Sequence, residues 1–429
     1  KLKRWAIMCA SAFLATSASG QSLTEAVTTT LRTNPEILAS RHNASAAEEL
    51  HKQARGAYFP SIDLVLAGGD ENSNNTTTRA AGSNDLSLTR EEKSIRLTQL
   101  LYDGFATSNF VKQQDALSEA AIARLVSTQE NTSLTAIQVY LEVLRRDAVV
   151  SLAQENLGHH EDTLVKIRER FESGVGTKVD VVQTQGRRAQ SKSNVLLSER
   201  DAANGRANFY RVVGETPRSL RDPSSPSGLP GTLGGAVEIA MNANPGLKAA
   251  EAELDAAVAA RKQARGAFHP RFDLELGATR NEDTDGSPGP NEDETAVIRM
   301  TYNLYRGGAD RARSRETEAR EFAARETVNQ NRRLVEENVT VIWNELEDIR
   351  MRLQFLEAHV KSTEEVLVVY NEQLSLGKRT LLDLLDVQNE LLRAKVALVS
   401  GQYAERLAEF RVLAATGQLL DSMGLSKGI

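Results

Sequence analysis

Apolar side chains recur at alternating steps of four and three residues through the second half of the chain, between residues 335 and 374. The positions are Val335, Val339, Ile342, Leu346, Ile349, Leu353, Leu356, Val360, Thr363, Leu367, Tyr370 and Leu374. A sustained heptad stripe is typical of long helices that pack side by side. A weaker copy of the stripe occurs 203 residues earlier, at 132–171.

Proline placement allows these helices to be very long, because proline breaks helix interiors. No proline occurs between residues 61 and 216 or after residue 290. We therefore predict long helices at 106–172, 178–212, 309–376 and 380–416. The longest would extend for roughly 100 Å at about 1.5 Å per residue. An ordinary soluble coiled coil is the alternative interpretation of this pattern alone.

Four short segments instead alternate apolar and polar residues with a period of two, which is the pattern of β-strands. They lie at about 60–69, 94–102, 270–278 and 295–304. In the first, Ile62 and Leu64 flank Asp63, and in the second Gln99 interrupts the apolar face. The polar stretches 70–90 and 280–294 are expected to be exposed hairpin tips. The chain is thus predicted to be mostly α-helical with a small β part.

The sequence indicates an internal duplication. The Asn-Pro pair at 34–35 recurs at 244–245, and the turn at Gly174 recurs at Gly377. A period of about 200 residues is too long for a solenoid and indicates two large repeats. We expect one repeat at 21–214 and another at 236–417, joined by a Pro-, Gly- and Ser-rich linker at 215–235. Residues 418–429 are expected to be a C-terminal tail.

The first twenty residues are predicted to be a signal peptide outside the fold. Lys1, Lys3 and Arg4 precede an apolar run, and small residues occupy positions 18–20. The run is shorter than the ~20 residues of a spanning helix, which disfavours the alternative of an N-terminal membrane anchor. The single cysteine, Cys9, lies in this segment, which excludes a disulfide scaffold and a Cys-based zinc site.

Composition and charge narrow the function classes further. The formal net charge is −6 with a pI near 5.7, which argues against a general nucleic-acid binder. Only 5% of the residues are aromatic, which argues against a large compact core. The six histidines, including His159 and His160, lack the spacing of a metal pair and are expected to be structural or surface residues. Neither a G-x-S-x-G motif nor a P-loop occurs.

The predicted strands have the length that crosses a bilayer when tilted, about ten residues. Aromatic residues near the strand ends on the helix side suggest an interfacial girdle. These are Tyr58, Phe59, Tyr102, Phe105, Phe268, Tyr302 and Tyr305. The alternative is two solvent-facing hairpins packed on the helices.

Four strands are too few to close a barrel, and an open strand edge in lipid costs several kcal/mol for each unpaired backbone group. If the strands span a membrane, several chains must share one barrel. Two chains would supply eight strands and a filled interior, whereas three would supply twelve and a water-filled lumen. Charged residues on the predicted inward face fit such a lumen. They are Asp63, Arg96, Asp273, Glu275 and Arg299.

Taken together, these features resemble the TolC-type outer-membrane efflux protein family over residues 21–417. The motifs that carry the resemblance are Asn34-Pro35, Asn244-Pro245, Tyr102-Asp103-Gly104, Tyr305-Arg306-Gly307-Gly308 and the stretch from Gly377 to Asp386. The resemblance implies a homotrimer with a shared twelve-stranded barrel in the outer membrane of a Gram-negative bacterium. It also implies a helical tunnel in the periplasm that docks on a periplasmic adaptor bound to an inner-membrane ABC or proton-driven transporter. No enzymatic activity and no cofactor are expected.

The two turns between the long helices are the candidate functional site. By resemblance, the residues of the gate or pore constriction are Asp180, Asp383, Asp386 and Arg379, and those of the tips that contact the adaptor are Gly174, Thr177, Gly377 and Thr380. Threefold symmetry would bring up to six carboxylates together, which would favour cations and raise some carboxylate pKa values.

Helix capping is the alternative role for two of these acids, since Thr177 with Asp180 and Thr380 with Asp383 resemble capping boxes. By resemblance, Arg379 is expected to form a restraining ion pair between neighbouring helices. The chain departs from the family prototype at Leu374, where the prototype has a tyrosine.

We interpret the chain as an exit duct, with type I secretion of polypeptides slightly favoured by the general form of the Tyr-Asp-Gly and Tyr-Arg-Gly junctions. Multidrug or small-molecule efflux is the alternative cargo. A soluble periplasmic coiled-coil adaptor is the alternative of a different class.

Overall fold

The computed structural model describes residues 20–425 of the chain. The predicted signal peptide therefore lies outside the described residues, apart from Gly20. The described chain forms two compact units. The helical unit comprises residues 20–38, 129–236 and 339–425, and the sheet unit comprises 39–128 and 237–338. Within the described residues, no helix combines the length and apolar character needed to cross a membrane.

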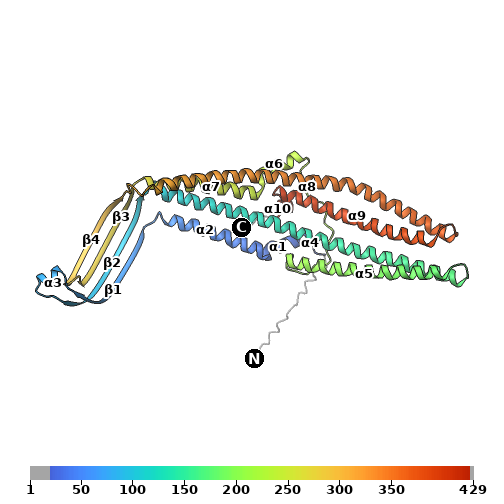
Figure 1. Ribbon diagram of the computed structural model, residues 1–429, viewed down its shortest axis with the longest axis horizontal. Helices are drawn as coiled ribbons and strands as arrows, with labels where there is room; N and C mark the ends of the chain where they lie inside the picture. Colours follow the sequence, from blue (N-terminus) through green and yellow to red (C-terminus); the bar gives the residue numbers. More distant parts are fainter. Residues whose placement is uncertain (1–19, 426–429) are drawn as a thin grey trace, which may run out of the picture. The chain divides into compact units, whose positions relative to one another are not determined.

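The sheet unit contains one antiparallel sheet with the order β1-β2-β3-β4 (Figure 1). Its strands are β1 (Ser61–Ser73), β2 (Leu86–Tyr102), β3 (Arg271–Thr284) and β4 (Ser287–Thr301). The central pairing of β2 with β3 places Leu97 opposite Leu276 and so joins the two hairpins. Each repeat of the sequence thus supplies one hairpin to a common sheet.

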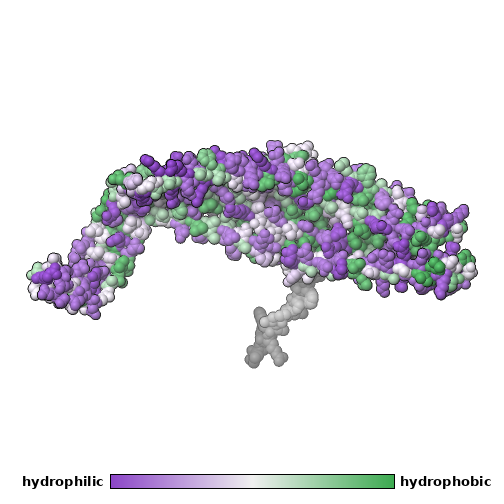
Figure 2. Space-filling model, viewed as in Figure 1, coloured by the Kyte–Doolittle hydropathy of each residue, from purple (hydrophilic) through white to green (hydrophobic). Residues whose placement is uncertain are grey.

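The sheet is amphipathic, as its alternating sequence predicts. Because Ile62 pairs with Leu97 and Leu97 with Leu276, apolar residues of adjacent strands share one face. On the other face Asp63 is opposite Arg96, and Glu275 forms a bidentate pair with Arg299, with N–O distances of 2.7 and 2.9 Å. Figure 2 shows hydrophobic surface along the strands and a hydrophilic tip beyond them.

The strands extend well beyond the ranges expected from the sequence, and this is a correction. The stretches expected to be loops, 70–90 and 280–294, are largely paired strand, and only 74–85 and 285–286 remain between the strands. Pro288 and Pro290 look like loop residues in the sequence, but β4 is an edge strand and tolerates them. At the other end β4 stops at Thr301, three residues earlier than expected.

The tips of the two hairpins are bound to each other. The Glu71 carboxylate accepts hydrogen bonds from the backbone N–H groups of Asp285 (3.1 Å) and Gly286 (2.9 Å). It also accepts one from Arg90 at 3.0 Å. The short helix α3 (Thr76–Ala80) joins this cluster through Asn75, whose amide donates to the Asp285 carbonyl. These polar contacts explain why the strands remain paired outside the apolar part of the sheet.

Helices α2 (Pro35–Gly56) and α7 (Pro245–Ala264) complete the sheet unit together with parts of α4 (Ala106–Glu172) and α8 (Ala309–Ser375). Alanines cover the buried face of α7, which allows it to pack closely. Its Leu247 and Ala250 contact Val328 of α8. Arg261 of α7 lies 2.7 Å from the buried carboxylate of Glu321 on α8.

The helical unit is built from α1 (Leu23–Thr33), α5 (Lys178–Val213), α9 (Leu381–Ala415) and the remaining parts of α4 and α8. The remaining elements are the short helices α6 (Leu233–Ala243) and α10 (Leu419–Ser422) and the 3-10 helix η1 (Arg265–Phe268). Helix α6 is shared between the two units, and η1 belongs to the sheet unit. The heptad stripe of α8 is buried or half-buried from Val339 to Leu374, as predicted. Packing of α8 on α9 buries Val360 and Leu367 against Leu384.

The core of the helical unit fixes the segments that lie outside the long helices. The Tyr140 hydroxyl lies 2.8 Å from the Gln21 carbonyl and 2.7 Å from the Arg221 carbonyl, and it accepts the Arg221 N–H at 3.0 Å. The expected linker 215–235 is thus anchored to α4. The expected C-terminal tail begins with the short helix α10, whose Leu419 and Leu420 are fully buried in this core.

Candidate functional site at the helical turns

Both long helical hairpins turn through a glycine in the left-handed conformation. Gly377 has φ +70°, and the following Lys378 N–H donates to the Gln373 carbonyl at 2.9 Å. Gly174 has φ +79°, and the Val175 N–H donates to the Arg170 carbonyl at 2.9 Å. A residue with a side chain is strained at such φ values, which explains glycine at both positions.

The capping boxes predicted from the sequence are confirmed at both turns. At the start of α9, the Asp383 N–H donates to the Thr380 hydroxyl, and the Thr380 N–H and hydroxyl donate to the Asp383 carboxylate. Thr177 and Asp180 repeat this arrangement at the start of α5. Asp180 and Asp383 therefore have a structural role whatever else they do.

The cap also sets the charge state of Asp383. The hydrogen bonds from Thr380 hold the pKa of Asp383 below its ordinary value, and nearby Arg379 lowers the pKa further. In a symmetric ring, like-charge repulsion is expected to raise some carboxylate pKa values. Within one chain the pKa of Asp383 is lowered instead, so its carboxylate stays ionised at neutral pH.

Arg379 contacts its own hairpin. Its guanidinium lies 4.4 Å from the centre of the Tyr370 ring, donates to the Gln373 side chain at 3.1 Å, and lies 3.7 Å from Asp383. Tyr370 therefore holds the arginine by a cation–π contact from one turn before Leu374. Within the described chain the ion pair of Arg379 is with Asp383, four residues further on, and the restraining pair between neighbouring helices stays a prediction.

Arg187 supplies an ion pair between hairpins that the sequence analysis missed. Its Nη2 atom lies 2.8 Å from an oxygen of Asp386, which joins α5 to α9. Arg170 adds a second connection, because its guanidinium donates to the Leu374 carbonyl at 2.8 Å. No local motif marks either contact, since each depends on which faces of two distant helices meet.

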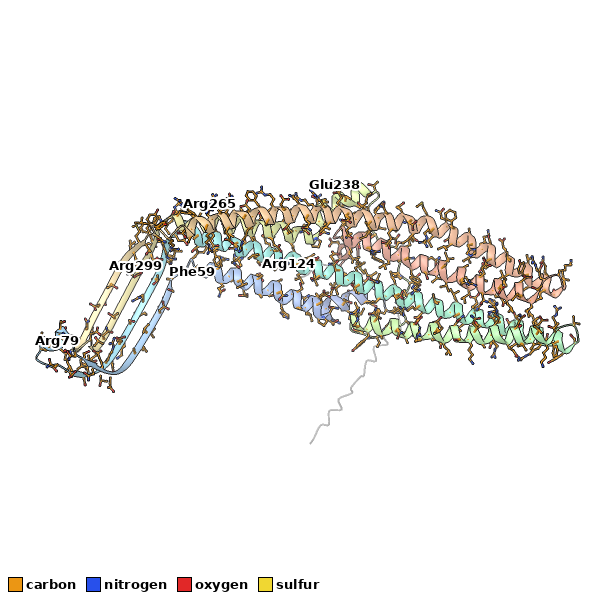
Figure 3. The ribbon with its side chains drawn as sticks, viewed as in Figure 1. Phe59, Arg79, Arg124, Glu238, Arg265 and Arg299 are labelled. Carbon is orange, nitrogen blue, oxygen red and sulfur yellow. The ribbon has the colours of Figure 1, made fainter. Side chains whose placement is uncertain are left out.

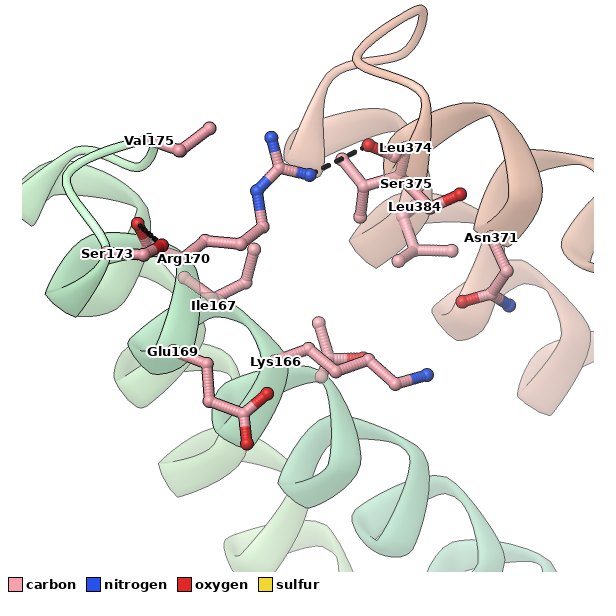
Figure 4. A pocket seen from close by; sticks show the side chains of 11 residues that line it. Lys166, Ile167, Glu169, Arg170, Ser173, Val175, Asn371, Leu374, Ser375 and Leu384 are labelled. Carbon is pink, nitrogen blue, oxygen red and sulfur yellow. Dashed lines mark hydrogen bonds between the residues drawn. The ribbon is translucent and has the colours of Figure 1, made fainter.

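A cavity of about 660 Å³ lies between the two turns (Figure 4). Arg170 reaches across it from the end of α4 to Leu374 at the end of α8. Lys166 and Glu169 also line it, beside the apolar Ile167 and Leu384. The turns are thus held by a few polar contacts around a partly open space.

A buried polar layer lies further along the hairpins. Gln388 of α9 donates to the Thr163 hydroxyl of α4 at 3.1 Å, and Asn156 of α4 donates to Ser191 of α5 at 3.2 Å. His160 is buried in this layer, and burial lowers its pKa while a hydrogen bond with Asn389 opposes that shift. Among the described residues, no group of three or more His, Cys, Asp or Glu side chains could hold a metal ion.

The expected girdle residues lie where the strands meet the helices. The ring of Tyr102 packs edge-on against Phe105, with centres 5.7 Å apart, and lies 6.3 Å from Phe272. The other expected residues have exposed side chains: Tyr58, Phe59, Phe268, Tyr302 and Tyr305. Figure 3 shows Phe59 at the helix end of the sheet and Arg79 at the opposite end.

The sequence model of a protein family described as outer membrane efflux protein matches residues 26–215 and 236–418, which together are most of the chain. The chain belongs to this family. It is 26% identical over 415 residues to the outer membrane efflux protein BepC of Brucella suis, covering 95% of this chain and 88% of the relative.

Two other relatives are similarly distant. The outer membrane protein TolC of Vibrio cholerae is 23% identical over 436 residues, which cover 97% of this chain and 95% of the relative. The alkaline protease secretion protein AprF of Pseudomonas aeruginosa is 24% identical over 402 residues, which cover 87% of this chain and 79% of AprF. The chain is thus similar both to a relative named for efflux and to one named for secretion.

Solved structures share the fold. The outer membrane protein VceC of Vibrio cholerae superposes with a TM-score of 0.76 at 18% identity, covering 95% of this chain and 97% of the other. The outer-membrane channel OprN gives a TM-score of 0.79 at 20% identity, with coverages of 94% and 90%. This efflux protein is therefore an outer-membrane protein of Gram-negative bacteria and not an enzyme. The alternatives of a soluble adaptor and an ordinary coiled coil are wrong.

Proposed function

We propose that the protein assembles as a homotrimer into the exit duct of a tripartite export system. The open sheet carries this proposal. Among the described residues, β1 and β4 each pair with one neighbour and leave the other edge free. An amphipathic sheet with two free edges cannot lie in lipid alone, because unpaired backbone groups there are costly. Three copies would supply twelve strands, enough for a water-filled lumen lined by residues such as Glu275 and Arg299.

The helical unit supports assembly independently. On α8, Val341, Phe355 and Val369 are exposed and recur at fourteen-residue steps. On α5, Val182, Leu196 and Tyr210 are exposed and recur at fourteen-residue steps. These stripes lie on the outer helices of the unit, since α9 and α4 contact each other between them. We infer that α8 of one copy packs on α5 of the next, which closes a ring of helices.

The helical tunnel would extend into the periplasm and narrow at the turns. We propose that the constriction is lined by Asp180, Asp383, Asp386 and Arg379. The tips at Gly174, Thr177, Gly377 and Thr380 would contact a periplasmic adaptor. Exposed apolar residues around the turns support a protein contact there, and they include Val175, Val179, Leu376 and Leu382. An inner-membrane ABC or proton-driven transporter would supply the energy.

Type I secretion of polypeptides is the cargo we favour. The similarity to AprF, which is named for alkaline protease secretion, supports it. Small-molecule efflux is the second candidate, which the similarity to BepC supports.

A deletion strain distinguishes the two cargoes. If the chain serves secretion, its loss abolishes release of the polypeptide exported by a co-encoded ABC transporter and leaves sensitivity to dyes and detergents unchanged. Increased dye sensitivity with normal secretion would favour efflux instead. The mass of the detergent-extracted complex tests assembly: we expect three copies, and a monodisperse single copy that is stable without detergent would refute the duct itself.

A further inference from the structure

Each of the two acids at the start of α9 is matched by a guanidinium of the same chain. Asp383 lies 3.7 Å from Arg379 and accepts hydrogen bonds from Thr380. Asp386 lies 2.8 Å from Nη2 of Arg187, which comes from α5. The two acids and two arginines carry no net charge. A ring built from three copies would therefore be far less acidic than the carboxylates alone suggest.

Arg187 is the better anchored member of its pair. Its side chain is 33% exposed, whereas that of Asp386 is 60% exposed. The charge of Arg187 also faces His160 of α4 and helps to lower the pKa of that histidine, after the larger effect of burial. Because exposed ion pairs contribute little to stability, the main consequence of Arg187 is electrostatic. It sets the charge and position of the carboxylate that Asp386 presents to solvent.

The adjacent Arg188 provides a comparison within the same helical turn. Its Nη2 atom lies 2.9 Å from Glu161 of α4. Removing Arg188 would remove the same charge from α5 as removing Arg187 but would leave the ion pair of Asp386 intact. A comparison of the two variants therefore distinguishes loss of the ion pair with Asp386 from a general change in the charge of α5.

We propose that Arg187 is a positioning residue for Asp386 and sets the ion selectivity of the periplasmic mouth. The inference rests on the proposed function, because it takes Asp386 as part of the constriction. Without Arg187, the Asp386 carboxylate of each chain would lose its ion pair, and a trimer would gain three unpaired carboxylates around one axis. Rings of carboxylates in a narrow aqueous passage favour cations.

The test uses the purified full-length complex in planar bilayers. Two quantities are measured: the reversal potential in a KCl gradient, and the concentration of hexaamminecobalt(III) that blocks half of the current from the periplasmic side. We expect Arg187→Ala to increase cation selectivity and to lower the half-blocking concentration about tenfold, the order expected for added charge near a protein surface. Arg187→Lys keeps the charge and should remain close to wild type, as should Arg188→Ala.

Asp386→Asn separates this inference from the gate assignment. We expect it to weaken the block, and we expect Arg187→Ala/Asp386→Asn to behave like Asp386→Asn alone. If Asp386→Asn weakens the block but Arg187→Ala matches wild type, the role of Arg187 is refuted while the gate stands. If Asp386→Asn itself changes nothing, the gate assignment fails. Arg187→Gln, checked for trimer stability in detergent, replaces Arg187→Ala if that variant does not assemble.

Discussion

The hydroxyl of Tyr140 anchors the linker, and Tyr140→Phe tests this directly. The change removes one oxygen and leaves the ring in the core beside Phe209. In the native chain the hydroxyl contacts the carbonyls of Gln21 and Arg221 and the Arg221 N–H, at 2.7 to 3.0 Å. Because a hydroxyl has a single proton, it donates to one carbonyl at a time while it accepts the N–H.

The expected cost follows from the groups left without a partner. The Arg221 N–H also donates to the Gln21 carbonyl at 3.2 Å, so these two groups keep a partner without the hydroxyl. The main loss is the bond to the Arg221 carbonyl, and leaving a buried acceptor unsatisfied costs about 1–3 kcal/mol. The cost falls on the local contact between the linker and α4, so the linker should open without unfolding of the whole chain. At about 1.4 kcal/mol for each factor of ten, opening should become roughly 5-fold more frequent or greater.

Limited digestion with trypsin measures this opening, because Arg218 and Arg221 are cleavage sites within the linker. When opening is fast, the cleavage rate follows the population of the open state. Tyr210→Phe is the matched control, since Tyr210 has an exposed side chain in the same unit. Burial raises the pKa of Tyr140 to about 12, so the difference should not change between neutral and mildly alkaline pH. Equal cleavage of Tyr140→Phe and wild type would refute the anchoring role.

Three further variants test other parts of the structure. Asp386→Ala combined with Arg379→Ser should raise single-channel conductance in planar bilayers, and unchanged conductance and cation block would contradict the gate assignment. Burial lowers the pKa of His160 in the folded chain, so the unfolded chain binds the proton first and stability should fall as pH drops below about 6.5. Thermal melting at pH 7.5 and 5.5 should show this loss in wild type and in the control His159→Gln, which changes the half-exposed neighbouring histidine. A loss of equal size in His160→Gln would contradict the assignment to His160. Phe355→Asp, at an exposed position of α8, should reduce the yield of detergent-stable trimer, and a normal yield would exclude α8 from the contact between copies.

Local sequence signals predict the long helices and their turns well. Heptad spacing and the absence of proline placed the helices to within one residue of α4, α5, α8 and α9 at each end. The Thr-x-x-Asp spacing predicted both capping boxes because a cap involves residues only three positions apart. Signals of this kind suffice wherever the structure depends on near neighbours.

Contacts between distant segments escaped the sequence analysis. The pair of Arg187 and Asp386 depends on the relative rotation of two helices, which no local spacing encodes. The long hairpins were shortened in the prediction because Pro288 and Pro290 look like loop residues unless β4 is known to be an edge strand. The burial of Leu419 likewise depends on a core assembled from α1, α4, α5 and α9.

The pairing of β2 with β3 has an evolutionary consequence. An ancestor with one hairpin would need six identical copies to supply the strands of the proposed trimer. Fusion of two such genes would make alternate subunit contacts permanent and free the halves to diverge. The turns record that divergence: Arg379 and Asp386 of the second half align, at the 203-residue offset, with Gly176 and Gln183 of the first. In a sixfold ancestor every charged residue would occur six times around the opening. In the fused chain a charged residue of one half can alternate with a different residue of the other half.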